Sequence, residues 1–304
     1  MQKLLVVVGQ TAVGKTALSL KLAKALNGEI ISVDSRLFYR GMDIGTAKPS
    51  VSEQTVVPHH LIDICNPDET ISLGAFQRLA YQTIDAVLAN GRLPILVGGT
   101  AQYVNAVVEG WGIPEVPPHL ELRQALAALG GEELARWLTY LDPVAAERLD
   151  PRNVRRVIRA LEVTLVAGQP ISELQHKTPP PYDICVIGLR REREVLYERI
   201  DQRIDQMVQE GLLDELIALR DAGYGRKLPS MSGLGYKQLW PYLEGEMGLE
   251  EAVERIKFET HRFARHQATW FRKKGVLIHW FDMDEAGVET AVFDFVTEWL
   301  SSEN

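Results

Sequence analysis

The stretch of the chain that decides its fold reads Gly9-Gln10-Thr11-Ala12-Val13-Gly14-Lys15-Thr16. It matches the phosphate-binding pattern G-x-x-x-x-G-K-[ST], which is meaningful between a strand and a helix. The apolar run at residues 4–8 predicts a strand buried on both faces of a parallel sheet, and apolar residues recur at helical spacing over residues 18–26. In that setting the loop amides and the helix N-terminus bind an anion, Lys15 adds a positive charge, and the Thr16 hydroxyl is available to Mg²⁺. We therefore expect this loop to bind a diphosphate or a triphosphate.

The length and composition are those of an ordinary globular protein. The chain has 304 residues, 46% of them hydrophobic, which suits one large α/β domain or two smaller ones. No apolar run approaches the roughly 20 residues that span a bilayer, and the N-terminus leads directly into the first predicted strand, so we expect a cytoplasmic protein without a membrane segment. Cys65 and Cys185 are too few for a disulfide framework or a cysteine-based zinc site, and Mg²⁺ is the only metal that the sequence suggests.

Two further predicted strands bring polar residues to the edge of the sheet where ligands bind. Residues 29–34 read as a buried strand that ends in Asp34, at the carboxyl edge of an open α/β sheet. Asp34 is either an Mg²⁺ ligand or a general base, and the residues alone leave both roles open. The strand at residues 93–97 runs into Gly98-Gly99-Thr100, where Thr100 either caps a helix or contacts a ligand oxygen. Residues 39–49 predict a loop over this site.

The α/β pattern is interrupted once. Residues 114–180 contain no good strand, so we expect an all-helical insertion domain there. A core strand resumes at residues 184–189, which makes the core discontinuous, with segments 1–113 and 181–304. The predicted fold class is therefore α/β, with a parallel sheet of the phosphate-loop NTPase type flanked by helices, and with a helical insertion domain.

Within the insertion, four arginines follow helical spacing. They fall at i, i+3, i+4 and i+7 and predict one stripe, formed by Arg152, Arg155, Arg156 and Arg159. The apolar residues predicted on the opposite face are Val154, Val157, Ile158 and Leu161. Such a stripe suits a polyanion, although a solvated face paired with local acids has the same pattern.

A second basic surface is predicted near the C-terminus. Residues 255–274 hold seven lysines and arginines against one acid, Glu259, and follow a glycine-rich connection at residues 232–237. Arg199 and Arg203 lie one turn apart on another predicted helix, where one of them can clamp a phosphate. The net charge of −8 opposes indiscriminate nucleic-acid binding, but such an average conceals local basic faces.

With these features collected, the sequence resembles the tRNA dimethylallyltransferases (tRNA isopentenyltransferases) of the bacterial type without a zinc finger, along essentially its whole length. The segments that carry the resemblance are Gly9 to Thr16, Asp34-Ser-Arg-Leu-Phe-Tyr39, Asp43-Ile-Gly-Thr-Ala-Lys-Pro49, Pro58-His-His-Leu-Ile-Asp63, Gly98-Gly-Thr-Ala-Gln-Tyr103, Arg159-Ala-Leu-Glu162, Gly235-Tyr-Lys237 and Gln267-Ala-Thr-Trp-Phe271. The resemblance implies transfer of a dimethylallyl group from dimethylallyl diphosphate to the exocyclic N6 of the adenosine at tRNA position 37, 3′ of the anticodon, with release of diphosphate. It implies Mg²⁺ as cofactor and the tRNA anticodon stem-loop as partner, and we expect a monomer.

Position by position, the resemblance implies that Asp34 is the general base, Thr100 the hydroxyl near the reacting carbon, and Arg203 the diphosphate clamp. The implied phosphate-binding residues are Gly9, Gln10, Thr11, Ala12, Val13, Gly14, Lys15 and Thr16, with Thr16 also on Mg²⁺. The implied tRNA contacts are Asp34, Ser35, Arg36, Leu37, Thr100, Arg123, Arg155, Arg156, Val157, Ile158, Arg159, Ser232, Gly233, Leu234, Gly235, Tyr236 and Lys237. The sequence departs from the family pattern at Leu37, Ala101, Gln102, Ser232 and Gly233.

The residues leave three alternatives open. An isopentenyltransferase acting on free adenine nucleotides would use the same loop, aspartate and threonine, although the basic insertion argues against it. A nucleoside or shikimate-type small-molecule kinase would consume ATP. A phosphate-loop regulator that binds RNA and hydrolyses nucleotide would give no prenylated product.

Overall fold

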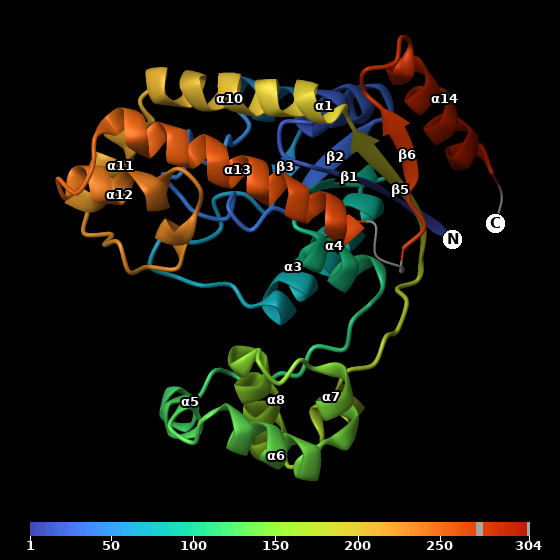
Figure 1. The fold of residues 1–304 in the computed structure, drawn as a ribbon. Helices are drawn as coiled ribbons and strands as arrows, with labels where there is room; N and C mark the ends of the chain where they lie inside the picture. Colours follow the sequence, from blue (N-terminus) through green and yellow to red (C-terminus); the bar gives the residue numbers. More distant parts are fainter. Residues whose placement is uncertain (272–275, 303–304) are drawn as a thin grey trace. The chain divides into compact units, whose positions relative to one another are not determined.

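The chain divides into two compact units (Figure 1). The structure is a computed structural model that describes residues 1–271 and 276–302. Met1–Val108 and Pro181–Asn304 form the core unit, and Glu109–Pro180 forms the helical unit. The boundary predicted at residue 114 lies inside the helical unit, because the chain entering that unit pairs with the chain leaving it: the amide of Thr178 donates to the carbonyl of Gly110 at 2.8 Å.

The core unit is built on a six-stranded parallel sheet of order β3-β2-β4-β1-β5-β6. The strands are β1 (Gln2–Gly9), β2 (Gly28–Ser32), β3 (His59–His60), β4 (Leu93–Gly98), β5 (Tyr182–Arg190) and β6 (His279–Asp282). The predicted parallel sheet and its discontinuity are confirmed, since β5 pairs with the whole length of β1 after the chain returns from the helical unit. The edge strand β6 has no counterpart among the predicted strands.

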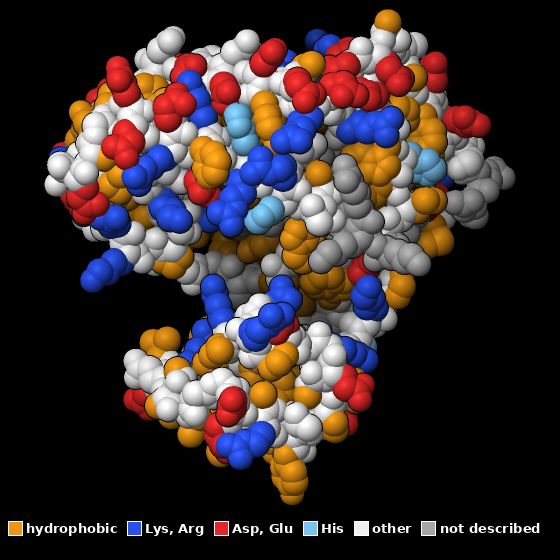
Figure 2. Space-filling model, viewed as in Figure 1, with side chains coloured by type: hydrophobic (Ala, Val, Ile, Leu, Met, Phe, Trp, Pro, Cys, Tyr) orange, Lys and Arg blue, Asp and Glu red, His pale blue; other side chains and the backbone are white. Residues whose placement is uncertain are grey.

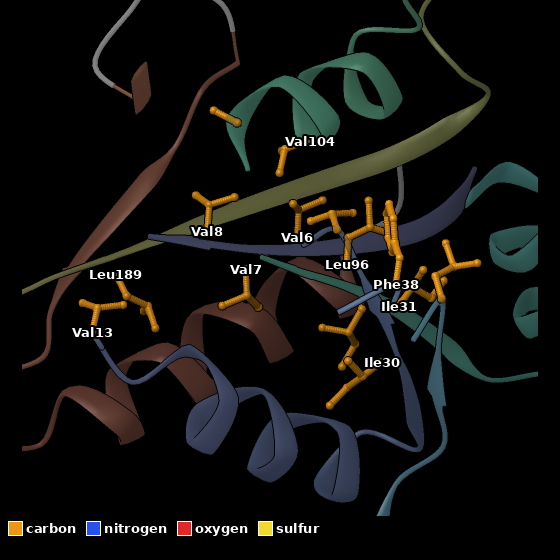
Figure 3. Close-up of a cluster of buried hydrophobic side chains, with 14 of the residues drawn as sticks. Val6, Val7, Val8, Val13, Ile30, Ile31, Phe38, Leu96, Val104 and Leu189 are labelled. Atoms are coloured by element: carbon orange, nitrogen blue, oxygen red, sulfur yellow. The ribbon is translucent and has the colours of Figure 1, made fainter. Parts of the chain in front are cut away.

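Helices cover both faces of this sheet (Figure 1). They are α1 (Lys15–Ala25), α2 (Val51–Val56), α3 (Leu73–Ala89), α4 (Ala101–Val108), α10 (Arg193–Gln209), α11 (Leu212–Asp221), α12 (Tyr236–Leu243), α13 (Leu249–Phe271) and α14 (Val288–Ser301), with a 3-10 turn η1 (Ser230–Ser232). Figure 3 shows Val7 of β1 directed toward the α1 side of the sheet, and Val6 and Val8 toward the side where Val104 of α4 lies. The apolar run of β1 is continuous because a parallel strand is buried on both faces.

The helical unit has a core of its own. Its helices are α5 (Leu120–Ala127), α6 (Gly131–Leu141), α7 (Pro143–Arg148), α8 (Val154–Ala167) and α9 (Ile171–Leu174). Leu134, Leu138 and Leu161 are buried together in its centre. The described residues of both units include no helix that is long and apolar enough to cross a bilayer.

Candidate active site

The loop at residues 9–16 connects β1 to α1, as predicted. Gly14 has a φ of 113° at the N-cap of α1, a conformation that favours glycine. A Cβ on Gly9 would lie 2.6 Å from the carbonyl oxygen of Leu189. No described side chain caps this end of α1, so its first amides are available to a ligand. The end of the loop therefore presents the uncapped first amides of α1, the positive end of a helix, at the carboxyl edge of the sheet.

Lys15 lies folded back over this loop. Its Nζ donates to the carbonyls of Gly9 at 3.0 Å and Gln10 at 2.7 Å. Burial lowers the pKa of Lys15 to about 8; the charge of Asp34 opposes this shift and the charge of Arg203 adds to it. The three side chains therefore share one electrostatic environment, although their positions in the sequence are far apart.

Asp34 follows β2 at the same edge of the sheet. The amide of Val33 still donates to Val97 at 2.9 Å, so the chain leaves the sheet only at Asp34. Asp34 Oδ1 accepts the amide of Arg36 at 3.0 Å, which fixes the carboxylate in a tight turn. Its Oδ2 has no hydrogen bond to another described residue. One carboxylate oxygen is thus held by the protein and the other is available to a ligand.

The turn before Thr100 packs closely against the Asp34 loop. A Cβ on Gly98 would lie 2.7 Å from Val33 Cγ2, so a glycine is required for this approach. The carbonyl of Thr100 accepts the amides of Tyr103 and Val104, which begins α4. The Thr100 hydroxyl makes no hydrogen bond to another described residue, and Thr100 is not among the residues that line the cavity described next. Its contact with a ligand stays a prediction.

A cavity of about 410 Å³ lies beside Asp34. Its ionisable lining residues are Asp34, Arg36, Arg203, Tyr236, Glu259, Arg262 and His266. Its apolar wall comes from α10, α11 and α13 and consists of Ile200, Ile204, Met207, Leu212, Ile256 and Phe263. Thr11 and Ala12 of the phosphate loop also line it. A cavity that joins a phosphate loop to an apolar wall suits a small apolar group carried on a diphosphate.

The arginines around the phosphate loop have two different positions. Arg203 lines the cavity; burial lowers its pKa, Asp34 opposes this shift, and Arg199 adds to it. Arg199 Nε donates to the carbonyl of Ala12 at 3.0 Å, and Arg191 Nε to that of Val13 at 3.1 Å. Of the two arginines that the sequence offered as phosphate clamps, Arg203 is thus the one facing the cavity, while Arg199 supports the loop.

Arg36 joins two of the segments that are predicted to contact RNA. Its guanidinium donates to the carbonyls of Pro229 and Ser230 at 3.3 Å each, and to Ser232 Oγ at 3.2 Å. Residues 34–37 therefore lie next to residues 232–237. Of these, Ser232 and Lys237 are exposed, Ser35, Leu37 and Leu234 are half-buried, and Gly233 and Gly235 are buried.

Tyr236 is a correction to the predicted RNA contacts. Its side chain has an exposed fraction of 0%, so it does not present a surface to RNA. Its hydroxyl donates to Glu215 Oε1 at 2.6 Å, and burial together with Glu215 raises the pKa of Tyr236. A Cβ on Gly45 would lie 2.5 Å from the tyrosine ring, which therefore packs directly on the loop at residues 43–48. Tyr236 supports that loop, whose Gly45 and Thr46 line the cavity.

The predicted stripe of four arginines is wrong at its start. Helix α8 begins at Val154, so Arg152 lies before it and pairs with Asp150 at 3.0 Å. Val154 is 38% exposed and does not share the buried face. Of the predicted stripe, Arg155 and Arg156 are exposed and without an ion-pair partner among the described residues.

Arg123 and Arg159 converge on Glu162, whose side chain is completely buried. Arg123 donates two hydrogen bonds of 2.8 Å, Arg159 one of 2.6 Å, and the amide of His119 one of 2.7 Å. Burial raises the pKa of Glu162, but the hydrogen bonds outweigh it and hold this pKa at about 2. The two arginines are thus structural, and because 36% and 35% of their side-chain surface stays exposed, the RNA contact predicted for them stays a prediction.

Val157 and Ile158 are also placed by packing. Val157 was predicted to contact RNA, but it is 1% exposed in the core of the helical unit, so its side chain offers no surface to RNA. Ile158 is half-buried and packs against the same core. Helix α8, which carries both residues, packs against α5 and α6 in this core.

The basic surface on α13 is partly neutralised by neighbouring acids. Lys257 pairs with Asp205 of α10 at 2.8 Å, and Arg255 with Glu251 at 2.8 Å. Arg265 is exposed and donates to the Tyr197 hydroxyl at 3.0 Å. Figure 2 shows lysine and arginine side chains gathered over this helix. The predicted members Arg272, Lys273 and Lys274 lie outside the described residues.

Comparison with known proteins decides the family. A sequence model described as IPP transferase matches residues 37–274. The chain belongs to this family. It is 55% identical over 274 residues to a tRNA dimethylallyltransferase of Herpetosiphon aurantiacus, covering 89% of this chain and 87% of the relative. It is 49% identical over 303 residues to a tRNA dimethylallyltransferase of Roseiflexus sp. strain RS-1, covering 98% and 99%.

Solved structures agree with this membership. The full-length tRNA isopentenylpyrophosphate transferase of Bacillus halodurans matches with a TM-score of 0.75 and 44% identity, over 99% of this chain and 97% of that chain. A eukaryotic dimethylallyltransferase acting on tRNA matches with a TM-score of 0.89 and 26% identity, over 100% of this chain and 81% of that chain. The predicted α/β fold and the predicted family are confirmed.

Three supporting residues of this IPP transferase chain were not predicted. Arg191 holds the phosphate loop, Glu215 holds the loop at residues 43–48, and Gln267 contacts both the phosphate loop and the turn before Thr100. Each acts on a backbone group far away in the sequence, which leaves no local pattern. The one available signal was that Gln267 opens a segment that carries the family resemblance.

Proposed function

We propose that the protein transfers the dimethylallyl group of dimethylallyl diphosphate to the exocyclic N6 of adenosine 37 in tRNA. The observation that carries this proposal is the single cavity lined by Asp34, Arg203 and residues of the phosphate loop, with an apolar wall beside them. Relatives named tRNA dimethylallyltransferase that align over most of the chain support the assignment of the substrates.

The phosphate loop binds the diphosphate in this proposal. The amides at the start of α1, Lys15 and Arg203 stabilise the negative charge that develops when the C–O bond of the allylic diphosphate breaks. The loop amides are preorganised, because Arg199 and Arg191 donate hydrogen bonds to carbonyls of the same loop. The electron pair of the broken bond leaves with the diphosphate, which these cations retain in the cavity.

The donor set at Thr16 fits Mg²⁺. No group of three or more His, Cys, Asp or Glu side chains among the described residues forms a metal cage. Mg²⁺ typically takes one or two protein oxygens together with substrate phosphates and water, which the exposed Thr16 hydroxyl at the first turn of α1 can complete. When bound there, Mg²⁺ would neutralise charge on the diphosphate.

Asp34 is the proposed general base. The adenine amine is a weak nucleophile because its lone pair is delocalised into the ring. As the new N6–C bond forms, the amine loses a proton, and Asp34 Oδ2 accepts it while Oδ1 stays bonded to the amide of Arg36. We assign the Thr100 hydroxyl to the reacting carbon and leaving oxygen, as the resemblance implies.

The RNA surface in this proposal includes residues 34–37, residues 232–235, Lys237 and the exposed pair Arg155 and Arg156. The target base must leave its stack to reach a cavity of this size, as base-modifying enzymes require. Arg36, which joins the first two segments, places them beside the same cavity that Asp34 lines. Thr100, Arg123 and Arg159 are further proposed contacts.

One assay tests the function. The protein is incubated with labelled dimethylallyl diphosphate, Mg²⁺ and either bulk tRNA or AMP. We expect label in tRNA at position 37 and none in AMP. Label in AMP instead would favour the nucleotide isopentenyltransferase, ATP consumption would favour a kinase, and RNA binding without product would favour a regulator.

A further inference from the structure

Gln267 of α13 is a buried polar residue that the proposed reaction does not use directly. Its exposed fraction is 6%. Its Oε1 accepts the amide of Thr11 at 2.8 Å, and its Nε2 donates to the carbonyl of Gly99 at 2.9 Å. Thr11 belongs to the phosphate loop and Gly99 directly precedes Thr100. One side chain therefore bridges the two loops that carry the diphosphate site and the Thr100 hydroxyl.

The bridge requires a primary amide. The group between Thr11 N and Gly99 O must accept a hydrogen bond at one atom and donate one at the other, and among side chains of this length only glutamine does both. The approach also requires a glycine, since a Cβ on Gly99 would lie 2.3 Å from Gln267 Nε2 and 3.1 Å from the carbonyl of Gly9. Glutamate would keep the bond to Thr11, but its second carboxylate oxygen would face the carbonyl oxygen of Gly99 and repel it. Methionine would make neither bond.

Helix α13 holds the phosphate loop at a neighbouring point as well. Gln10 Nε2 donates to the carbonyl of Ala264, about one turn before Gln267. The loop carbonyls of Ala12 and Val13 accept hydrogen bonds from Arg199 and Arg191, which come from other parts of the chain. Several side chains therefore support the conformation of the phosphate loop, whereas Gln267 links this loop to the turn before Thr100.

We propose that Gln267 is a positioning residue that sets the separation between the phosphate loop and Thr100 in the reacting complex. This inference rests on the proposed prenyl transfer. Misplacement of reacting groups by about 1 Å costs on the order of 10²-fold in rate. Loss of the bridge therefore lowers turnover, while the other supports preserve the affinity of the loop for diphosphate.

Two variants and a matched control test the bridge. Gln267→Met removes both hydrogen bonds and Gln267→Glu removes the one to Gly99. Gln77→Met is the control, because Gln77 also donates from a helix to a backbone carbonyl of the core unit, that of Ala106 at 2.6 Å, and is not among the residues that line the cavity. The measurements are kcat and KM for tRNA prenylation, pyrophosphate affinity, melting temperature, and amide hydrogen exchange in peptides covering residues 9–16 and 98–103.

For Gln267→Met we expect kcat to fall about 10- to 100-fold, with pyrophosphate affinity within about threefold of wild type. Amide exchange should rise in both peptides. For Gln267→Glu we expect a similar loss of kcat, with faster exchange confined to residues 98–103. The Gln77 control should change neither kcat nor these two peptides. If Gln267→Met fails to fold, Gln267→Glu carries the same comparison.

The inference is overturned if a Gln267 variant keeps kcat within about twofold of wild type while its melting temperature falls, because Gln267 would then be structural only. Faster exchange in neither peptide of Gln267→Met would also overturn it. A wild-type protein that labels neither tRNA nor AMP would refute the proposed function instead, and the exchange pattern would still show whether the bridge couples the two loops.

Discussion

The hydroxyl of Tyr236 donates to Glu215 at 2.6 Å, and this carboxylate also accepts the amides of Asp43, Ile44 and Gly45 at 2.7, 2.8 and 3.1 Å. Four donors from two parts of the chain thus meet on one side chain of α11. Because Tyr236 and the loop residues Gly45 and Thr46 all line the cavity, this pair helps to determine the shape of the cavity.

Tyr236→Phe removes one of these four donors and keeps the ring that packs on Gly45. We expect it to lower the free energy of unfolding by about 1–3 kcal/mol, the usual cost of losing a partner of a buried polar group. Glu215→Gln should cost more, because it removes the charge that accepts all four bonds. Denaturant unfolding of the full chain measures both. Equal stability of Tyr236→Phe and wild type would show that the hydroxyl contributes little.

Asp34→Asn keeps the shape of the side chain and removes its ability to accept a proton. We expect turnover to fall by roughly 10²–10⁴, the usual contribution of a general base. Pyrophosphate binding should stay near that of wild type, since the loop amides, Lys15 and Arg203 are intact. Single-turnover prenylation of tRNA at saturating substrate measures the effect. Turnover within a few-fold of wild type would exclude Asp34 as the base.

Lys15 gives the phosphate site a pH dependence. Its pKa is lowered from 10.5 to about 8, so the charge that attracts diphosphate is present below pH 8 and is lost above it. We expect the pyrophosphate affinity of wild type, divided by that of Lys15→Met, to fall as pH rises from 7 to 9.5, by up to about tenfold per pH unit above 8. Dividing the two affinities cancels the effect of pH on the protonation of pyrophosphate itself. Titration calorimetry at several pH values measures both affinities.

The free energy of unfolding of the ligand-free protein should rise with pH over this range, whereas the affinity ratio falls. A lysine whose pKa is lowered in the folded state is destabilising while it is charged there. Stability therefore rises as pH increases from about 8 toward 10.5, where the unfolded chain still holds a proton that the folded chain has released. A pH-independent affinity ratio would contradict the assigned environment of Lys15.

A structural feature of this protein could be predicted from the sequence when a local sequence pattern indicates it. The phosphate loop, the four central strands and the position of Asp34 were predictable, because a buried strand, a glycine-rich turn and a helix start each have a local pattern. The helical repeat also predicted that Val157 and Arg156 lie on different faces of α8. It could not predict where α8 begins, and so it included Arg152 in a stripe to which that residue does not belong.

The contacts that shape the site were not predictable in the same way. Glu162 stands three residues after Arg159, yet its burial and its bond to Arg123 depend on how α5 and α8 pack. Arg199 and Arg203 are equivalent in sequence, and only the fold turns one to a loop carbonyl and the other to the cavity. These contacts are determined by tertiary packing, which leaves no short-range pattern in the sequence.

Glu162→Gln tests the buried network of the helical unit. Glu162 is buried, but its two arginine partners keep about a third of their side-chain surface exposed, so solvent screens the charges that remain. We therefore expect a loss of about 1–3 kcal/mol for the unit that contains it, the usual cost of removing a partner of buried polar groups. The control is Asp150→Asn at the exposed Arg152 pair, which should leave the unfolding midpoint unchanged. Because the pKa of Glu162 is lowered from 4.5 to about 2, its contribution is complete above pH 4.5 and is lost as pH falls toward 2. Acid unfolding followed by circular dichroism should show this loss in wild type and not in the variant.

The last prediction concerns the exposed arginines of α8 in a chain whose net charge of −8 opposes indiscriminate RNA binding. If Arg155 and Arg156 contact tRNA phosphates, replacing both with Ala should weaken tRNA binding and reduce the slope of log affinity against log salt by about 0.7–0.9 for each lost contact. Arg152→Ala is the matched control, since that arginine lies outside the helix and pairs with Asp150, and its slope should equal that of wild type. Pyrophosphate affinity should not change in either variant, because the phosphate loop belongs to the core unit. An unchanged slope in the double variant would mean that the RNA surface lies on residues 34–37, on residues 232–235 with Lys237, and on the basic side of α13.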